Sequence, residues 1–270
     1  MRIFKIFIFL FIYISHTSSF IYFFTNNYFK GLKQINTLND FNSIKYCSKL
    51  SSSVYFDTPN ITDYKYNTRI KIVEFHNNIY ICFKGSSNFI DWKTNFDKSL
   101  ITHYHNFHIF SIHKGYYMQY ISVSNKIHNY LYNKNFDKLY ICGHSLGGAL
   151  ATICSFDLVI NNIVHYNNIS CITFGIPRIG DYNFSLIYNF YNITTYRIVL
   201  SGDPVPKLPI NPYYIHSTPS YYLKNNNIYY KPNKIYLAYK KFISYLFDTK
   251  FSFKNHSINQ YIHTLDLINF

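Results

Sequence analysis

Residues 138–151 read KLYICGHSLGGALA, an apolar run that ends in the pentapeptide Gly143-His144-Ser145-Leu146-Gly147. This G-x-S-x-G pattern is typical of a sharp turn from a strand into a helix, which pushes the hydroxyl of the central serine into solvent. Side chains two positions before and two after that serine would collide in the turn, so Gly143 and Gly147 present hydrogen in place of a Cβ. Ser145 is therefore the candidate nucleophile.

The sequence on both sides of Ser145 supports this turn. Residues 139–142 are predicted as a short buried strand, and the following helix is predicted from the apolar positions Leu146, Leu150, Ile153, Cys154, Leu158 and Val159. The helix N-terminus would direct free N–H groups and a positive dipole end at the place where negative charge develops during attack. The alternative is a tight turn whose serine is merely exposed, and the flanking strand and helix favour the nucleophile turn.

A serine hydroxyl needs a histidine to remove its proton and a carboxylate to fix the histidine tautomer. Chains with this turn carry them in the order Ser, Asp or Glu, His. Asp203 follows the apolar run 195–201 within SGDPVP, a loop at the end of a predicted strand, where such side chains gather. Asp181 is explained as a helix N-cap. Asp157 lies within the helix behind Ser145, and Asp248 and Asp266 follow no strand, so Asp203 is predicted as the acid.

Three histidines, His216, His256 and His263, follow Asp203 in the chain. His256 lies in the polar loop FKNHSINQY, whereas His263 lies in an apolar terminal stretch that is typical of a packed or surface histidine. His144 is adjacent to Ser145, and the tight turn aims neighbouring side chains in different directions. His256 is therefore predicted as the base.

The rest of the chain alternates predicted strands and helices. The pattern predicts helices at 37–57, 116–130 and 182–191, a hairpin of 69–75 with 79–83, and strands at 169–175 and 195–201. This alternation predicts an α/β fold with a central, mostly parallel sheet flanked by helices.

The N-terminus has the architecture of a secretory signal peptide. Arg2 and Lys5 precede an apolar run at 6–14, and small polar residues follow, which predicts a signal peptide at 1–19 and one domain at 20–270. The apolar run is short for a bilayer span, although residues 20–24 extend it toward an uncleaved membrane anchor, the alternative reading.

The chain is strongly basic, with a formal net charge of +14 that removal of Arg2 and Lys5 lowers by two units. Such a charge favours anionic partners, either membrane surfaces or nucleic acid. The lysines are scattered and the chain lacks the signatures of nucleic-acid-binding folds, so an anionic membrane surface is expected and nucleic acid is not.

The sequence contains five cysteines, Cys47, Cys82, Cys142, Cys154 and Cys171. Cys82, Cys142 and Cys171 fall in apolar runs, which favours small buried side chains over a disulfide framework, and the pairing of the five stays open. The chain has no C-x-x-C pair and its histidines lack metal-ligand spacing, so no metal is expected.

Four blocks stand in a characteristic order: ICFKGSSNFIDW at 81–92, CGHSLGGALA at 142–151, TFGIPRIGD at 173–181 and YRIVLSGDPVPKLP at 196–209. With NHSINQY at 255–261, they resemble the class 3 lipases, the fungal-lipase-like branch of the α/β-hydrolases. The resemblance implies the α/β-hydrolase fold, with Ser145 as nucleophile, Asp203 as orienting acid and His256 as base.

The resemblance also implies an oxyanion hole made by the backbone N–H groups of Ser86 and Leu146, with help from the Ser86 hydroxyl. It further implies a lid and substrate-binding segment whose apolar side carries Phe89, Ile90, Trp92 and Phe96. From the sequence alone, Trp92 is equally explained as a core anchor. Two positions depart from the family pattern: Lys84 stands where relatives usually have Arg, and residues 216–220 (HSTPS) occupy a block where relatives commonly carry an acidic residue.

The expected function is that of a secreted serine hydrolase, which cleaves carboxylic esters of lipids at an interface through an acyl-enzyme and needs no cofactor. Triacylglycerol lipase, phospholipase A1 and non-lipid esterase all remain open. The alternative from another class is an inactive lipid-binding or membrane-associated protein that keeps a lipase fold.

Overall fold

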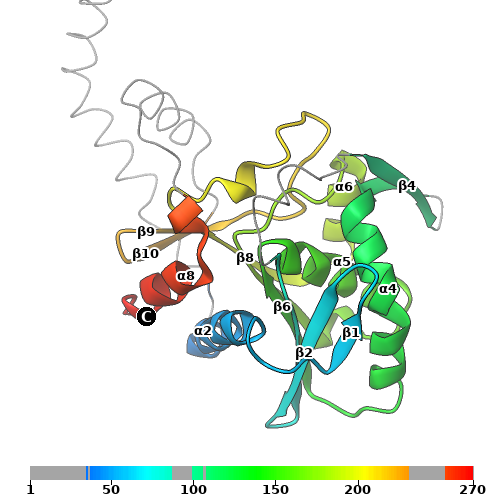
Figure 1. Cartoon of the computed structure of the whole chain (residues 1–270), viewed down its shortest axis with the longest axis horizontal. Coiled ribbons are helices and arrows are strands. Elements are labelled where there is room, and N and C mark those ends of the chain that lie inside the picture. Colours follow the sequence, from blue (N-terminus) through cyan, green and yellow to red (C-terminus); the bar gives the residue numbers. More distant parts are fainter. Residues whose placement is uncertain (1–34, 36, 87–98, 106–107, 231–252, 270) are drawn as a thin grey trace, which may run out of the picture.

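A single mixed sheet organises the molecule. The computed structural model describes residues 35, 37–86, 99–105, 108–230 and 253–269 (Figure 1). Eight strands lie in the order β1-β2-β3-β6-β7-β8-β9-β10, and the pairs from β3 to β9 are parallel, whereas the strands at both edges pair antiparallel. The bounds are β1 Ile61–Asp63, β2 Thr68–Phe75, β3 Asn78–Phe83, β6 Lys138–His144, β7 Ile169–Phe174, β8 Thr194–Leu200, β9 Tyr221–Lys224 and β10 Asn227–Tyr230. The predicted mostly parallel sheet is confirmed.

Helices cover both faces of this sheet (Figure 1). One face packs against α4 (Lys114–Leu131), α5 (Leu146–Ile160) and α6 (Tyr182–Phe190), and the other packs against α2 (Leu38–Ser53) and α8 (Ile258–Asp266). Three short 3₁₀ turns complete the described helices: η1 Tyr166–Asn168, η2 Val205–Lys207 and η3 Phe253–His256.

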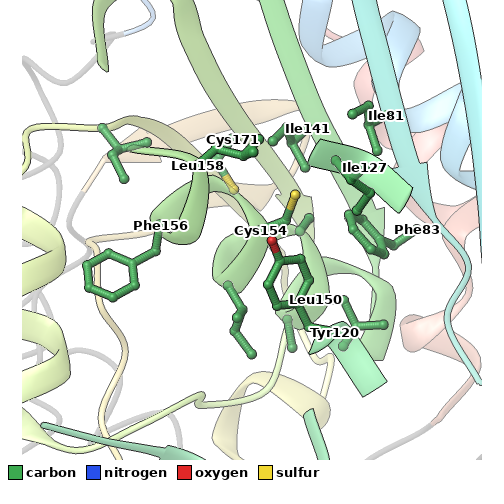
Figure 2. Packing of buried hydrophobic residues seen from close by; sticks show 14 of the residues in the cluster. Ile81, Phe83, Tyr120, Ile127, Ile141, Leu150, Cys154, Phe156, Leu158 and Cys171 are labelled. Carbon is green, nitrogen blue, oxygen red and sulfur yellow. The ribbon is translucent and has the colours of Figure 1, made fainter. Parts of the chain in front are cut away.

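The helix α5 lies in the centre of the larger core cluster. Figure 2 shows Leu150 and Cys154 of α5 facing Ile141 of β6 and Tyr120 of α4. Every residue of β7 is buried, as expected for an inner strand of a parallel sheet that is covered on both faces. This packing fixes the N-terminus of α5, and with it Ser145, against the end of the sheet.

Several elements differ from the sequence-based expectations. The helix predicted at 37–57 ends at Ser53. The strands β1, β9 and β10, the hairpin of β4 (Leu100–His105) with β5 (His108–His113), and the helix α8 were not predicted. The hairpin forms a separate two-stranded sheet beside α6.

The five cysteines are all free and buried in the described part of the chain. The burial predicted for Cys82, Cys142 and Cys171 is thus confirmed. Burial raises the pKa of the Cys82 and Cys142 thiols well above its usual range, which keeps them protonated and unreactive.

The predicted signal peptide at 1–19 lies outside the described residues. None of the helices within the described ranges is both long enough and apolar enough to cross a bilayer.

Candidate active site

Ser145 occupies a strained turn between β6 and α5. Its backbone has φ 58° and ψ −129°, a region that favours glycine over residues with a side chain. Its N–H donates to the carbonyl of Phe174 at 2.9 Å, so the turn is tied to the neighbouring strand β7. A Cβ at Gly143 would collide with the backbone of Gly147, and one at Gly147 would collide with the carbonyl of Phe83. The close packing predicted from the two glycines is confirmed.

The side chain of Ser145 is enclosed: the residue is 5% exposed, whereas the sequence predicted a hydroxyl in solvent. The segment after β3 packs against the turn, because a Cβ on Gly85 would lie 3.5 Å from the Cβ of Ser145 and 2.6 Å from the carbonyl oxygen of His144. The serine is therefore buried at the carboxyl edge of the sheet.

Asp203 and His256 form a buried pair. His256 Nδ1 lies 3.0 Å from Asp203 Oδ1 and 2.9 Å from Oδ2, and the Asp203 side chain is fully buried. Asp203 follows β8 and His256 ends η3, so residues 53 positions apart meet at the edge of the sheet where Ser145 follows β6. The structure joins the two residues that the sequence singled out.

Two further donors hold the Asp203 carboxylate. The Tyr261 hydroxyl donates to Oδ2 at 2.6 Å, and the backbone N–H of Val205 donates to Oδ1 at 2.8 Å. The Tyr261 oxygen in turn accepts from the backbone N–H of Leu200 at 3.1 Å. Burial and the neighbouring Asp203 raise the pKa of Tyr261 well above its usual range, so the phenol remains a neutral donor.

A glycine is required beside this pair. Gly175 follows β7 with φ +59°, and a Cβ there would lie 2.6 Å from Asp203 Oδ2, 2.8 Å from the Tyr261 oxygen and 3.1 Å from His256 Nδ1. A side chain at Gly175 would therefore push apart the groups that orient the histidine.

His144 braces the other side of His256. Its Nε2 donates to the backbone carbonyl of His256 at 2.6 Å, and the two rings lie 4.5 Å apart between centroids. Because Nε2 carries the proton, Nδ1 is left to accept from the Tyr55 hydroxyl at 3.4 Å. Burial, followed by the neighbouring His256, lowers the pKa of His144 well below its usual range. His144 is thus a neutral support for His256, consistent with its rejection as the base for Ser145.

Tyr55, Tyr261 and the supporting role of His144 were missed by the sequence analysis. The chain contains 30 tyrosines, so their positions in the sequence carry no signal that separates these two from the rest. Only the fold brings Tyr55, two residues after α2, and Tyr261, in α8, to the same site.

The ring contact with His144, the residue before Ser145, places His256 beside the nucleophile turn.

The oxyanion-hole candidates lie within the described residues, whereas the lid candidates do not. Ser86 is partly buried at the end of the segment that follows β3, and Leu146 is the first residue of α5. Lys84, in the same segment, places its Nζ 5.6 Å from the centroid of the Tyr55 ring. The lid residues Phe89, Ile90, Trp92 and Phe96 lie outside the described residues.

The rejected candidates have structural roles. Asp181 caps α6, because its carboxylate accepts from Phe184 N at 2.8 Å. Asp157 binds Tyr120 and His128, far along α5 from Ser145. His263 is exposed on α8. No group of three histidine, cysteine, aspartate or glutamate side chains in the described ranges is placed to hold a metal ion.

The chain is similar to proteins of known families. Residues 80–213 match the family model described as lipase (class 3). A lipase of Caenorhabditis elegans, ZK262.3, is 41% identical over 91 residues, which cover 34% of this chain and 25% of the relative. A lipase of Rhizomucor miehei is 29% identical over 170 residues, which cover 61% of this chain and 47% of the relative. The chain thus spans less than half the length of these relatives.

Solved structures share the fold. The Rhizomucor miehei triacylglyceride lipase superimposes with a TM-score of 0.63 at 23% identity, over 72% of this chain and 84% of that chain. A lipase from Rhizopus microsporus var. chinensis gives a TM-score of 0.63 at 20% identity, over 72% and 78% of the two chains. The expected α/β-hydrolase fold is confirmed by these neighbours together with the mostly parallel sheet. Residues 80–213 belong to the class 3 lipase family.

Proposed function

We propose that this protein is a serine hydrolase that cleaves carboxylic esters of lipids through an acyl-enzyme. The observation that carries the proposal is the buried Asp203–His256 pair at the same sheet edge as the strained Ser145 turn. A structural turn would not need a backbone conformation that favours glycine at a serine, because such strain persists only where the surrounding structure enforces it.

The chemistry follows from the contacts. Ser145 Oγ attacks the ester carbonyl while His256 takes its proton at Nε2, because Nδ1 is turned toward Asp203. Asp203 holds the tautomer and stabilises the imidazolium, and the Tyr261 and Val205 donors keep the carboxylate in place. His256 then returns the proton to the leaving alcohol, which leaves the acyl group on Ser145. A water molecule attacks this acyl-enzyme with His256 again as the base, and the carboxylic acid is released.

The oxyanion forms where the two backbone segments meet. Leu146 N–H points from the first turn of α5, where the helix leaves N–H groups without intrahelical partners. Ser86 would add its backbone N–H and its hydroxyl from the segment that packs against the turn. No metal or organic cofactor is required for this sequence of steps.

The substrate class is supported by the relatives. The names of the curated relatives describe a secreted mono- and diacylglycerol lipase of Fusarium solani and a triacylglycerol lipase of Ricinus communis. We therefore propose lipid esters as the substrates. Phospholipids are included because a net charge of +14 attracts the chain to anionic lipid surfaces. Nucleic acid is not a proposed partner. We propose secretion through cleavage of residues 1–19, with residues 20–270 as the mature domain and an uncleaved membrane anchor as the alternative.

Fluorophosphonate labelling tests the function. The Ser145→Ala variant should lose both labelling and hydrolysis of triglyceride, phospholipid and short-chain ester substrates while its thermal unfolding stays cooperative. The matched control is Ser122→Ala, which removes a hydroxyl bonded only to the Gln119 carbonyl on α4. Labelling of the Ser145→Ala variant at the wild-type rate would exclude Ser145 as nucleophile. A wild-type chain that binds lipid without labelling or hydrolysis would instead indicate the inactive lipid-binding alternative.

The lid proposal has its own test. An apolar segment that moves to a lipid surface gains roughly 25 cal/mol per Å² that it buries. Trp92→Ser should therefore reduce hydrolysis of emulsified lipid much more than hydrolysis of a soluble short-chain ester. Trp92 is the sole tryptophan, so vesicles should also change the fluorescence of the wild-type chain. Equal losses on both substrates without a fluorescence change would make Trp92 a core residue.

A further inference from the structure

Three basic side chains gather around β8, on the face of the sheet that packs against α5 and α6. Arg197 extends from β8 and donates through Nε to the carbonyl of Thr218 at 3.0 Å. His216, two residues before Thr218, donates through Nε2 to the carbonyl of Pro206 at 2.7 Å. Both side chains are thus fastened to loops by neutral backbone groups.

Arg178 joins the cluster from the loop after β7. Its Nη1 donates to the carbonyl of Pro209 at 3.2 Å, and its backbone N–H donates to Leu208 O at 2.7 Å. The charges of Arg178 and Arg197 act on each other and on His216. The three groups therefore share one electrostatic environment.

Arg178 and Arg197 carry like charges, and Arg178 and His216 are partly buried. Arg197 is 8% exposed. Burial, and to a smaller extent Arg178, lowers its pKa to about 9. Burial and the two arginines lower the pKa of His216 well below its usual range. Enclosing a guanidinium without an opposite charge is costly, so the cluster calls for an anion.

No carboxylate of the described residues supplies that anion. The ion pairs of the described part of the chain involve Lys45, His128, Lys134 and His256, and neither arginine forms one. The Asp203 carboxylate is engaged by His256, Tyr261 and Val205 instead.

Two polar atoms beside the arginines also lack protein partners within the described residues. Thr173 lies next to Arg197 in the parallel register of β7 and β8, so both side chains point to the same face of the sheet. Its buried hydroxyl has no hydrogen-bond partner there, and neither has the enclosed Nδ1 of His216. Buried polar groups without a protein partner indicate a bound molecule that supplies the missing hydrogen-bond acceptor or donor.

We propose that Arg178, Arg197, His216 and Thr173 form a binding site for one small inorganic oxyanion that carries a proton, of the hydrogen phosphate type. A guanidinium fork matches two oxygens of the anion, the Thr173 hydroxyl can donate to a third, and Nδ1 of His216, whose Nε2 holds the proton, can accept from the P–OH group. The enclosure of Arg197 excludes a lipid headgroup, which must stay attached to its chains at a surface. The site is independent of the ester-cleaving function and stabilises the loops at 206–209 and 216–218, to which the basic side chains bind.

Inorganic phosphate is the probe for this site. At constant ionic strength, phosphate should raise the Tm of the mature chain saturably, by roughly 5 °C at a hundredfold excess over Kd. Isothermal titration calorimetry should give one site per chain. Arg197→Gln and Arg178→Gln should each abolish the saturable increase. Arg69→Gln, which removes the same charged group from an exposed position on β2, should retain it.

The two arginine variants keep the test decisive. If Arg197→Gln does not fold, Arg178→Gln still measures the site, because Arg178 is less buried. Phosphate also stabilises proteins non-specifically by exclusion from their surface, an effect that does not saturate. An equal increase in the wild-type chain and in Arg178→Gln, or no saturable increase in the wild-type chain, would overturn the proposal.

Discussion

The carboxylate of Asp203 accepts hydrogen bonds from a ring nitrogen, a phenol and a backbone N–H. Each donor comes from a different segment: His256 from η3, Tyr261 from α8 and Val205 from η2. The acid is therefore oriented by residues that the chain supplies after the nucleophile turn, and the phenol is the donor that a conservative substitution can remove.

Tyr261→Phe should lower kcat about tenfold with little change in KM. The lost hydrogen bond to a charged group is worth about 1.5 kcal/mol, and its loss loosens the orientation of Asp203. Steady-state kinetics on a soluble ester measure the effect. The control is Tyr188→Phe, which removes a buried phenol that bonds Thr195 and should leave kcat unchanged. Equal losses in both variants would show that Tyr261 acts only through stability.

The residues of this site differ in how far sequence could identify them. Ser145 was predictable because the tight turn requires glycines two residues before and after it, a pattern of only five residues. Asp203 was predictable because it directly follows an apolar strand. The contacts of His144 and Tyr261 depend on the packing of α8 against the sheet, which no local pattern encodes. The enclosure of Ser145 was missed for the same reason, since the covering segment at 84–86 is distant in sequence.

At the scale of elements, α4 and α5 are joined by a partly buried polar contact. Asp157 of α5 accepts from the Tyr120 hydroxyl at 2.5 Å and lies 2.6 Å from His128 Nε2, both on α4. The contact lies in the C-terminal half of α5, whereas Ser145 precedes its first residue. It therefore stabilises the helix pair without touching the site.

Asp157→Ala should destabilise the chain by about 2 kcal/mol, because the buried Tyr120 hydroxyl loses its acceptor. The urea unfolding midpoint measures this loss. Asp137→Ala, at an exposed carboxylate bonded to Asn77, should change stability by less than about 0.5 kcal/mol. Similar midpoints for the two variants would refute the structural role of Asp157.

The elements of the inner sheet were predictable, and those of its edges were not. The strands β3, β6, β7 and β8 read as apolar runs because both of their faces are buried. The strands β1, β9 and β10 have three or four residues and mixed burial, so their patterns are too short to detect. The polar hairpin of β4 and β5 likewise lacks the apolar alternation of a half-buried strand.

At the scale of the whole molecule, histidines dominate the response to acid. The chain has 12 histidines and 12 acidic residues, so its positive charge rises steeply as the pH falls through the range where histidine titrates. Repulsion among these charges opposes the compact state. Buried neutral histidines such as His144 add to the loss of folding stability in acid, because they must take up a proton when the chain unfolds.

The stability of the chain should fall as the pH drops below about 6.5. The pKa of His144 is lowered in the folded state, so the unfolded chain binds more protons there and stability rises with pH up to that value. Its contribution is at most about 1.4 kcal/mol per pH unit. His144→Gln should flatten the dependence of Tm on pH between 5 and 7, whereas His76→Gln, at an exposed position, should not. Parallel curves for all three chains would contradict this assignment.

The backbone of Ser145 also bears on how this protein can be made more heat-resistant. A serine at φ 58° costs on the order of 1–3 kcal/mol relative to a residue that adopts this conformation freely. Ser145→Gly should therefore melt at a higher temperature than the wild-type chain while losing its nucleophile. Selection for thermostability alone would discard this serine, so any screen that improves the protein has to select for turnover as well.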